Sequence, residues 1–276
     1  MNDIWFYENH TPGYEVRWKI TDILHNEKSD YQQISIMETV EFGRVMILDG
    51  ALQVSDKDEY IYHEMIAHVP LNAHPAPEKI LIIGGGDGGT LREVLKHQQV
   101  KSVDLIEIDR RVVELSKEYF PSMAGSFADP RANVQYADGV KYLEECSKQY
   151  DVIIIDSSDP VGPAIQLFSR EFYKNTYKAL NSSGILAVQS ESPIFYPQVF
   201  ADTVRNIRTV YDNAFVYLTT VPTYVSGPWS FTIGSKKYDP SILSSDRRQI
   251  NGLKYYNDKV HQSAFALPQY IIEMLR

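Results

Sequence analysis

The sequence has a single cysteine, no apolar run long enough to cross a membrane and no excess of positive charge. Because Cys146 is the only cysteine among 276 residues, no internal disulfide can form, and a reducing compartment is expected. No apolar stretch approaches the roughly 20 residues that a membrane-spanning helix needs. The first six residues show neither the basic n-region nor the apolar h-region of a signal peptide, so we expect no secretion signal. These absences predict a cytoplasmic protein without a membrane partner.

Acidic residues outnumber basic residues in the sequence. The chain has 27 Lys and Arg residues against 36 Asp and Glu residues, a formal net charge of −9. Such a chain would repel nucleic acid and attract small cations, so we predict no nucleic-acid partner. On charge alone, the simpler explanation is that acidity keeps a cytosolic protein soluble. With 43% hydrophobic and 23% charged residues, the composition is that of an ordinary globular protein.

The N-terminal part of the chain has the pattern of β-strands. Residues 1–58 lack the periodicity of a helix, and short alternating runs occur at 14–20 and 34–40. Turn residues at 41–43 and 49–50 separate such runs. We therefore predict a small antiparallel β domain over residues 1–58.

Residues 59–276 are predicted to form a second, larger domain. It begins with a helix over 60–68, where apolar residues recur at every fourth position. Pro70, Pro75 and Pro77 then indicate a connector, because proline cannot continue a helix.

Strands and helices alternate after this connector. Near-continuous apolar runs predict strands buried on both faces at 80–83, 103–108, 152–155 and 185–188. Helical stretches lie between them near 88–97, 110–119, 138–147 and 170–181. This alternation predicts a Rossmann-like, doubly wound, mostly parallel sheet of seven strands. Residues 214–220 and 229–235 have only a loop between them, which favours an antiparallel closing pair.

A glycine-rich loop follows the first of these strands. Gly84, Gly86 and Gly89 match the G-x-G-x-x-G spacing of loops whose backbone N–H groups usually face a pyrophosphate. The spacing alone is a weak indicator, because glycines often serve only the geometry of a turn. Asp87, in the middle of the loop, would repel a phosphate and attract a cation. The loop therefore predicts a nucleoside that carries positive charge.

Acidic side chains follow other strands of the predicted sheet. Ligands of such sheets bind beyond the carboxyl ends of the strands. Glu107 lies near the end of the second strand, about 20 residues past the loop, where a carboxylate commonly holds both ribose hydroxyls. Asp138 with Gly139 follows a further strand expected between 103–108 and 152–155. Asp156 with Asp159 follows the strand at 152–155, and Gln189 ends the strand at 185–188.

Each of these carboxylates also has a purely structural interpretation. Asp138 could cap the next helix, Glu107 and Asp109 could form a solvated rim, and Asp159 before Pro160 is a common turn pair. Structural carboxylates would be scattered over both edges of the sheet, however. Their concentration at one edge favours a binding site made by Asp87, Glu107, Asp138, Asp156 and Asp159.

Several segments match one known family in the same order. They are residues 48–53, 58–65, 84–89, 107–109, 129–131, 138–139, 156–163 and 222–224. Over nearly its whole length the sequence resembles the spermidine synthase family of aminopropyltransferases. The resemblance implies a methyltransferase-like catalytic domain. It also implies transfer of the aminopropyl group of decarboxylated S-adenosylmethionine to putrescine, giving spermidine and methylthioadenosine.

The resemblance implies roles for residues of the donor site. Glu107 would hold the ribose, Asp138 with Gly139 would recognise the adenine, and Asp87 would hold the aminopropyl ammonium. Either Gln32 or its neighbour Gln33 would contact the nucleoside. The positions that match the family's donor site are Gln32, Gln53, Asp87, Glu107, Asp138, Gly139 and Pro163.

The resemblance also implies an acceptor site. Asp156 would take the proton of the attacking amine, directly or through Tyr62, and Asp159 would hold the far amine. The amine-binding positions are His63, Asp87, Asp156, Asp159, Gln189 and Tyr224, with Tyr62 beside them. Two positions depart from the family pattern: His63 stands where some relatives have glutamine, and Val225 follows Tyr224 where proline is usual.

The implied reaction is a direct displacement at a sulfonium. Because a sulfonium is already a good leaving group, we predict no metal and no cofactor, and the donor is a co-substrate. Residues 157–169 are predicted to form a lid over the substrates. The family forms dimers and tetramers, and apolar residues that we expect to be exposed, such as Trp5 and Phe6, agree with a homodimer or homotetramer.

Three other functions would also fit parts of this pattern. An amine N-methyltransferase using S-adenosylmethionine would place the donor's carboxylate beside Asp87, and a dinucleotide-dependent oxidoreductase would place a pyrophosphate there. Both arrangements bring like charges together. A non-catalytic polyamine-binding protein would have no need of Asp156 and Tyr62.

Overall fold

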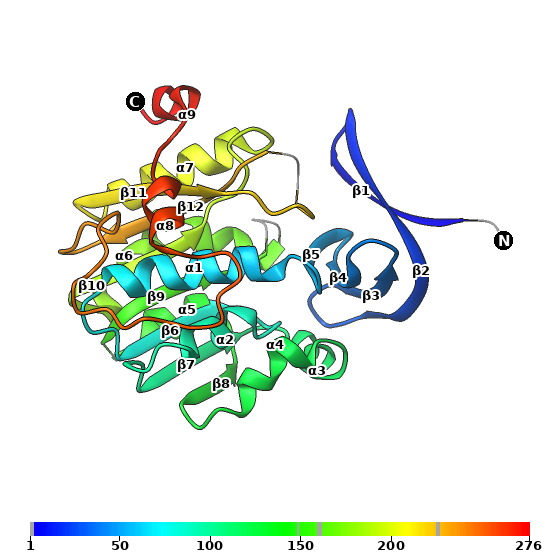
Figure 1. Cartoon of the computed structure of the whole chain (residues 1–276), viewed down its shortest axis with the longest axis horizontal. Helices are drawn as coiled ribbons and strands as arrows, with labels where there is room; N and C mark the ends of the chain where they lie inside the picture. The colour runs from blue at the N-terminus through cyan, green and yellow to red at the C-terminus, as the bar shows by residue number, and fades with distance from the viewer. Residues whose placement is uncertain (1–2, 148, 159–161, 225–226) are drawn as a thin grey trace.

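The computed structural model describes residues 3–147, 149–158, 162–224 and 227–276, and for residues 162 and 163 the backbone only. The chain contains two β-sheets (Figure 1). The N-terminal sheet lies at one end of the molecule. The larger sheet, with helices on both faces, forms the rest. The two sheets belong to the segments before and after residues 56–58.

The N-terminal sheet is a meander of five antiparallel strands, as the sequence predicted. In sheet order the strands are β1 (Ile4–Thr11), β2 (Tyr14–Lys28), β3 (Gln33–Thr39), β4 (Gly43–Leu48) and β5 (Ala51–Ser55). Asp49 and Gly50 both have positive φ, which suits the tight turn between β4 and β5. Trp5 is 50% exposed, but the expectation for Phe6 was wrong, because Phe6 packs on the cluster of Val45 and Ile47.

The larger sheet has seven strands in the order β11-β12-β10-β9-β6-β7-β8. They are β6 (Lys79–Gly84), β7 (Ser102–Glu107), β8 (Ala132–Tyr136), β9 (Tyr150–Asp156), β10 (Leu180–Gln189), β11 (Asn213–Thr219) and β12 (Trp229–Ser235). Strand β12 runs antiparallel to both β10 and β11, and the neighbours from β10 to β8 are parallel. The predicted sheet and its antiparallel closing pair are confirmed.

Helices cover both faces of this sheet (Figure 1). The α-helices are α1 (Glu59–Ala73), α2 (Gly89–Leu95), α3 (Arg110–Tyr119), α4 (Pro121–Ala124), α5 (Gly139–Glu145), α6 (Arg170–Ala179), α7 (Pro197–Arg208), α8 (Asp258–Ala264) and α9 (Gln269–Met274). Two 3-10 helices are η1 (Gly125–Ala128) and η2 (Gly162–Phe168). Within the described ranges, no helix combines the length and the apolar character needed to span a bilayer.

Alternate residues of the strands face the two helical layers. In β6, Ile80 and Ile82 join a core cluster with α1 and α2, whereas Leu81 and Ile83 join a cluster with α5 and α6. All four side chains are at most 2% exposed. This burial on both faces explains why the strand reads as one continuous apolar run.

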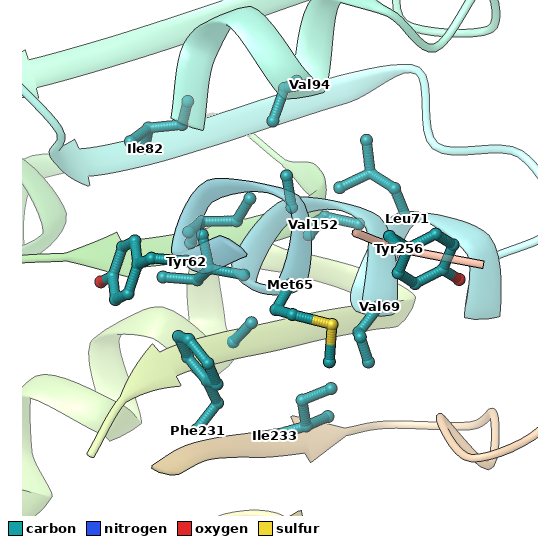
Figure 2. Packing of buried hydrophobic residues seen from close by; sticks show 14 of the residues in the cluster. Tyr62, Met65, Val69, Leu71, Ile82, Val94, Val152, Phe231, Ile233 and Tyr256 are labelled. Carbon is teal, nitrogen blue, oxygen red and sulfur yellow. The ribbon is translucent and has the colours of Figure 1, made fainter. Parts of the chain in front are cut away.

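Helix α1 does not end where the sequence predicted. It continues through Pro70 to Ala73, so the prediction of a connector beginning at Pro70 was wrong. Figure 2 shows the reason: α1 lies in the core, with Ile82 and Val94 on one side and Phe231 on the other. The last turn packs beside Tyr256, where Leu71 is 1% exposed, and this burial offsets the hydrogen bond that a proline cannot donate.

The pairing of the parallel strands aligns their carboxyl ends. Gly84 at the end of β6 lies opposite Asp156 at the end of β9, and Glu107 at the end of β7 lies opposite Tyr136. The residues that follow these strands therefore meet at one edge of the sheet, which faces the N-terminal sheet.

Candidate active site

A pocket of about 370 Å³ lies at this edge, between the carboxyl ends of the parallel strands and the N-terminal sheet. Most of the predicted site residues line it: Gln32, Gln53, Tyr62, His63, Asp87, Glu107, Asp138, Gly139, Asp156, Gln189 and Tyr224. Asp159 lies outside the described residues, as does part of the predicted lid. Pro163 is described by its backbone only, within η2. The structure thus brings together residues that are up to 192 positions apart, from 32 to 224.

Asp156 ends β9 in the interior of the pocket. The Tyr62 hydroxyl donates a 2.7 Å hydrogen bond to Asp156 Oδ1. The other oxygen, Asp156 Oδ2, is buried and accepts no hydrogen bond of ordinary geometry from a described residue. Burial and the negative charge of Asp87 raise the pKa of Asp156, and these effects outweigh the His63 cation and the neighbouring hydroxyls. Such a carboxylate is suited to accept a proton.

The loop after β6 is shaped around Asp156. The Gly85 N–H donates a 2.8 Å hydrogen bond to the Asp156 carbonyl oxygen. Gly84 has φ +83°, and a Cβ there would lie 2.1 Å from the same oxygen. Only glycine therefore allows β6 and β9 to approach this closely.

Asp87, in the glycine loop, is paired with a histidine. Its Oδ1 accepts a 2.6 Å hydrogen bond from the Gly89 N–H and lies 3.4 Å from Nε2 of His63. Burial opposes protonation of His63, but Asp87 and Glu59 together raise the pKa of this imidazole well above its ordinary value. Burial likewise opposes ionisation of Asp87, but the His63 cation prevails and lowers its pKa. Asp87 is therefore an ionised carboxylate with a cation already on one of its oxygens.

Glu107 and Asp109 are not the solvated rim that was one interpretation of the sequence. They are 9% and 2% exposed. Glu107 Oε1 accepts a 2.9 Å hydrogen bond from the Asp109 N–H, and burial raises the pKa of Glu107 to about 7. Asp109 caps α3 and accepts hydrogen bonds from Ser29 and Gln32, which join the N-terminal sheet to the larger sheet.

The structure distinguishes the two candidate glutamines. Gln32 lines the pocket, with its Nε2 2.9 Å from Asp109 Oδ2. Gln33 is absent from the lining and donates instead to Asn26 and to the backbone of Glu27. Asp138 combines both of its interpretations, because it accepts from the Val140 N–H as the cap of α5 and also lines the pocket.

Aromatic side chains form the far wall of the pocket. The Tyr224 hydroxyl donates a 2.9 Å hydrogen bond to the Gln53 carbonyl oxygen, which ties the wall to the N-terminal sheet. The Tyr224 ring lies 5.8 Å from the ring of Tyr62 and 4.8 Å from that of Trp229. Gln189 donates a 3.3 Å hydrogen bond to the Ser157 carbonyl oxygen. A flat, electron-rich surface with amide groups suits an extended amine.

Some lining residues were missed in the sequence. Glu8 and His10 reach the pocket from β1, and Glu8 adds a carboxylate that is 8% exposed. No local pattern distinguishes Glu8 from the other polar residues of its strand, because only the fold carries β1 to the pocket. Glu59, which contacts His63 but does not line the pocket, was also missed. The predicted helix began at 60, one residue too late to include it, although its spacing of four residues from His63 is a usable signal.

Sequence models of two protein families match the chain. The model described as "Spermidine synthase tetramerisation domain" matches residues 4–56, and the model described as "Spermine/spermidine synthase domain" matches residues 59–245. Together they cover both sheets and the pocket.

Individual relatives are similar over the whole length. The polyamine aminopropyltransferase of Bacillus subtilis is 43% identical over 276 residues, 100% of each chain. That of Moorella thermoacetica is 46% identical over 277 residues, 100% of this chain and 97% of its own. A solved spermidine synthase in complex with the transition-state analogue AdoDATO has a TM-score of 0.94 and 41% identity, covering 99% of this chain and 94% of its own. The spermidine synthase of Thermotoga maritima has a TM-score of 0.93, with the same identity and coverage.

Proposed function

The chain belongs to the spermidine/spermine synthase family, and on that basis we propose that it transfers the aminopropyl group of decarboxylated S-adenosylmethionine to putrescine. The products are spermidine and methylthioadenosine. The observation that carries the proposal is a partly buried carboxylate, Asp156, that is hydrogen-bonded to Tyr62 and shares one pocket with Asp87 and Glu107. Such a pocket suits two cationic substrates and the removal of one proton.

The donor is proposed to bind along the glycine loop. Glu107 would accept hydrogen bonds from the ribose, and its pKa near 7 would fall as those bonds form. Asp138 and Gly139 would meet the adenine, with Gln32, Gln53 and Pro163 nearby. The ammonium of the aminopropyl group would bind Asp87 through Oδ2, because Oδ1 is already engaged by the Gly89 N–H and faces His63.

The amine is proposed to bind between Asp156 and the aromatic wall. A free alkyl ammonium has a pKa of about 10.4, so neutralising it at pH 7 costs roughly 4 to 5 kcal/mol. The attacking nitrogen would give its proton to Asp156 and form a bond to the carbon beside the sulfonium. The carbon–sulfur bond breaks with its electron pair on sulfur, which leaves neutral methylthioadenosine. His63, Gln189, Tyr224 and Asp159 are the further proposed amine contacts, and Glu8 is a further carboxylate in reach of the pocket.

Assembly, location and cofactors are part of the same proposal. The match of residues 4–56 to a tetramerisation domain and the exposed side chains of Ile4, Trp5 and Tyr7 support a homo-oligomer formed through the N-terminal sheet. The single cysteine and the acidic composition support a cytoplasmic location. The sulfonium of the co-substrate supplies the leaving group, so the proposed chemistry uses no further cofactor.

Product analysis tests the proposal directly. The purified protein, given decarboxylated S-adenosylmethionine and putrescine, should release spermidine and methylthioadenosine in equal amounts. Cadaverine, agmatine and spermidine, tested in parallel, would define the acceptor range. A methylated amine formed from S-adenosylmethionine would instead identify an N-methyltransferase, and binding of both substrates without any product would identify a polyamine-binding protein.

The hydroxyl of Tyr62 should assist Asp156 without being essential. Because its pKa is raised well above the ordinary value by burial and by Asp156, Tyr62 remains a neutral donor. Tyr62→Phe removes a hydrogen bond to a carboxylate, so kcat should fall about tenfold. The loss of this donor should also raise the pKa of Asp156 and move the acidic limb of the kcat profile to higher pH. An unchanged acidic limb would contradict the proposed link between the two side chains.

A further inference from the structure

The Nδ1 atom of His63 contacts a second carboxylate, outside the pocket, that the proposed reaction does not use. Glu59, one helical turn earlier on α1, lies with its Oε2 2.6 Å from His63 Nδ1. Both side chains are nearly buried, at 6% and 3% exposure. The other ring nitrogen, Nε2, faces Asp87. The imidazole therefore lies between two carboxylates, one in the pocket and one behind it.

Glu59 is itself fixed by Arg92 of α2. Arg92 donates from Nη1 to Oε1 at 2.9 Å and from Nη2 to Oε2 at 2.8 Å, a bidentate pair. Burial opposes ionisation of Glu59, but His63 and Arg92 lower its pKa to about 2. Glu59 is therefore a permanent negative charge at a fixed place behind His63.

The imidazole of His63 packs closely against the start of α2. A Cβ added at Gly89 would lie 2.2 to 2.6 Å from atoms Cε1, Nδ1 and Nε2 of the imidazole, so the ring lies flat against the start of α2. The charged and titratable groups that face it are Glu59 and Tyr62 from α1, Asp87 from the glycine loop and Asp156 from β9. Of these groups, Asp87 and Asp156 repel each other and raise each other's cost of ionisation.

We propose that Glu59, anchored by Arg92, is a positioning residue that keeps His63 protonated. With the proton on His63 and not on a carboxylate, Asp87 and Asp156 are ionised at the same time. This inference rests on the proposed function. When two carboxylates lie in one partly buried site without a cation, their repulsion raises the pKa of one of them, which then holds a proton. With the proton on His63, Asp87 is free to bind the donor's ammonium and Asp156 is free to accept a proton from the amine. Glu59 touches neither substrate. Its charge opposes the ionisation of Asp87 directly, and it favours that ionisation through the His63 imidazole, which it keeps protonated.

The substitution Glu59→Gln removes the charge behind His63 and keeps the shape of the side chain. The proton should then move from His63 to a carboxylate, and both carboxylates become ionised only at higher pH. The acidic limb of kcat/KM for the donor should move up by about one pH unit, which is a loss of about tenfold at pH 7 and a recovery toward the parent value near pH 9. A purely structural defect would lower the rate at every pH.

The chain offers a matched control in Glu93→Gln. Glu93 is also buried at the contact of α1 and α2, accepts from Arg92 Nε at 2.7 Å and lies 3.0 Å from a histidine, His68. It does not contact His63. This variant should keep the parent's pH profile even if its melting temperature falls. The double variant Glu59→Gln/His63→Gln should show no further upward shift beyond His63→Gln alone, because the upward shift depends on one imidazole.

Two measurements separate the possible failures. The parent enzyme must form spermidine; if it does not, the proposed function fails. If the parent is active and Glu59→Gln keeps the parent's pH profile, or loses activity equally at every pH, the role of Glu59 is refuted. Calorimetric titration adds an independent readout. At pH 7 the variant should bind decarboxylated S-adenosylmethionine about tenfold more weakly, but should bind methylthioadenosine, which lacks the ammonium, as the parent does.

Discussion

Replacing Asp156 by asparagine should lower kcat by about 10²- to 10⁴-fold, the contribution typical of a positioned general base. The amide can still accept from the Tyr62 hydroxyl, but it cannot take the proton of the attacking amine. Because asparagine has nearly the same volume as aspartate, the fold and the binding of the donor should be retained. Asp156 must be ionised to act, so the parent's kcat should also fall as the pH drops through the raised pKa of this carboxyl.

Single-turnover kinetics with saturating donor and putrescine would measure this effect. Asp104→Asn is a matched control, because Asp104 is a buried carboxylate on β7 that accepts a 2.8 Å hydrogen bond from the Tyr150 hydroxyl but does not line the pocket. The control should retain kcat within a few fold. A rate for Asp156→Asn within about fivefold of the parent would leave Asp156 without a role as the proton acceptor.

Replacing Asp87 by asparagine should relax the choice of donor as well as slow the reaction. Intact S-adenosylmethionine carries a carboxylate beside the ammonium that Asp87 is proposed to hold. Like charges about 4 Å apart cost ~4 kcal/mol at an effective dielectric near 20, which is a discrimination of up to about 10³-fold. The structure strengthens this expectation, because Asp87→Asn removes the carboxylate charge that lies 3.4 Å from His63 Nε2 and leaves only neutral donors and the imidazole facing the donor's carboxylate.

The affinity of the Asp87→Asn variant for the two donors would measure this change. Decarboxylated S-adenosylmethionine should bind more weakly than to the parent and S-adenosylmethionine more tightly, so that the ratio of their dissociation constants falls by at least about tenfold. Methylthioadenosine should bind equally to both proteins, which controls for damage to the nucleoside site. If the variant still rejects S-adenosylmethionine as firmly as the parent does, Asp87 is not the source of donor selection.

The sequence predicted the larger sheet well where its signal is local. Strands β6, β7, β9 and β10 are buried on both faces, and their apolar runs are visible without a structure. Strand β8, with the sequence Ala-Asn-Val-Gln-Tyr, lies at the edge of the sheet and is only partly buried. It has no such run. Edge strands carry fewer apolar residues because they bury less surface, so this part of the pattern was weak.

The candidate site was predictable to the extent that strand ends determine it. Asp87, Glu107, Asp138 and Asp156 follow parallel strands, and parallel strands direct their carboxyl ends to one edge whatever the details of packing. The pairing of Asp87 with His63 was not predictable from the same rule. It depends on the angle at which α1 crosses α2 and on the absence of a side chain at Gly89.

The sequence by itself determined the order of strands and helices, the edge at which acidic side chains gather, and the resemblance to a family. The first two follow from periodicity and spacing, which act over a few residues, whereas the resemblance rests on matching segments along the whole chain. Only the tertiary structure decided that Pro70 stays inside α1, that Gln32 and not Gln33 faces the pocket, and that Glu8 reaches it from β1. The tertiary structure also decided the charge on His63, because that charge depends on burial and on the carboxylates of Glu59 and Asp87, which the fold brings to its two sides.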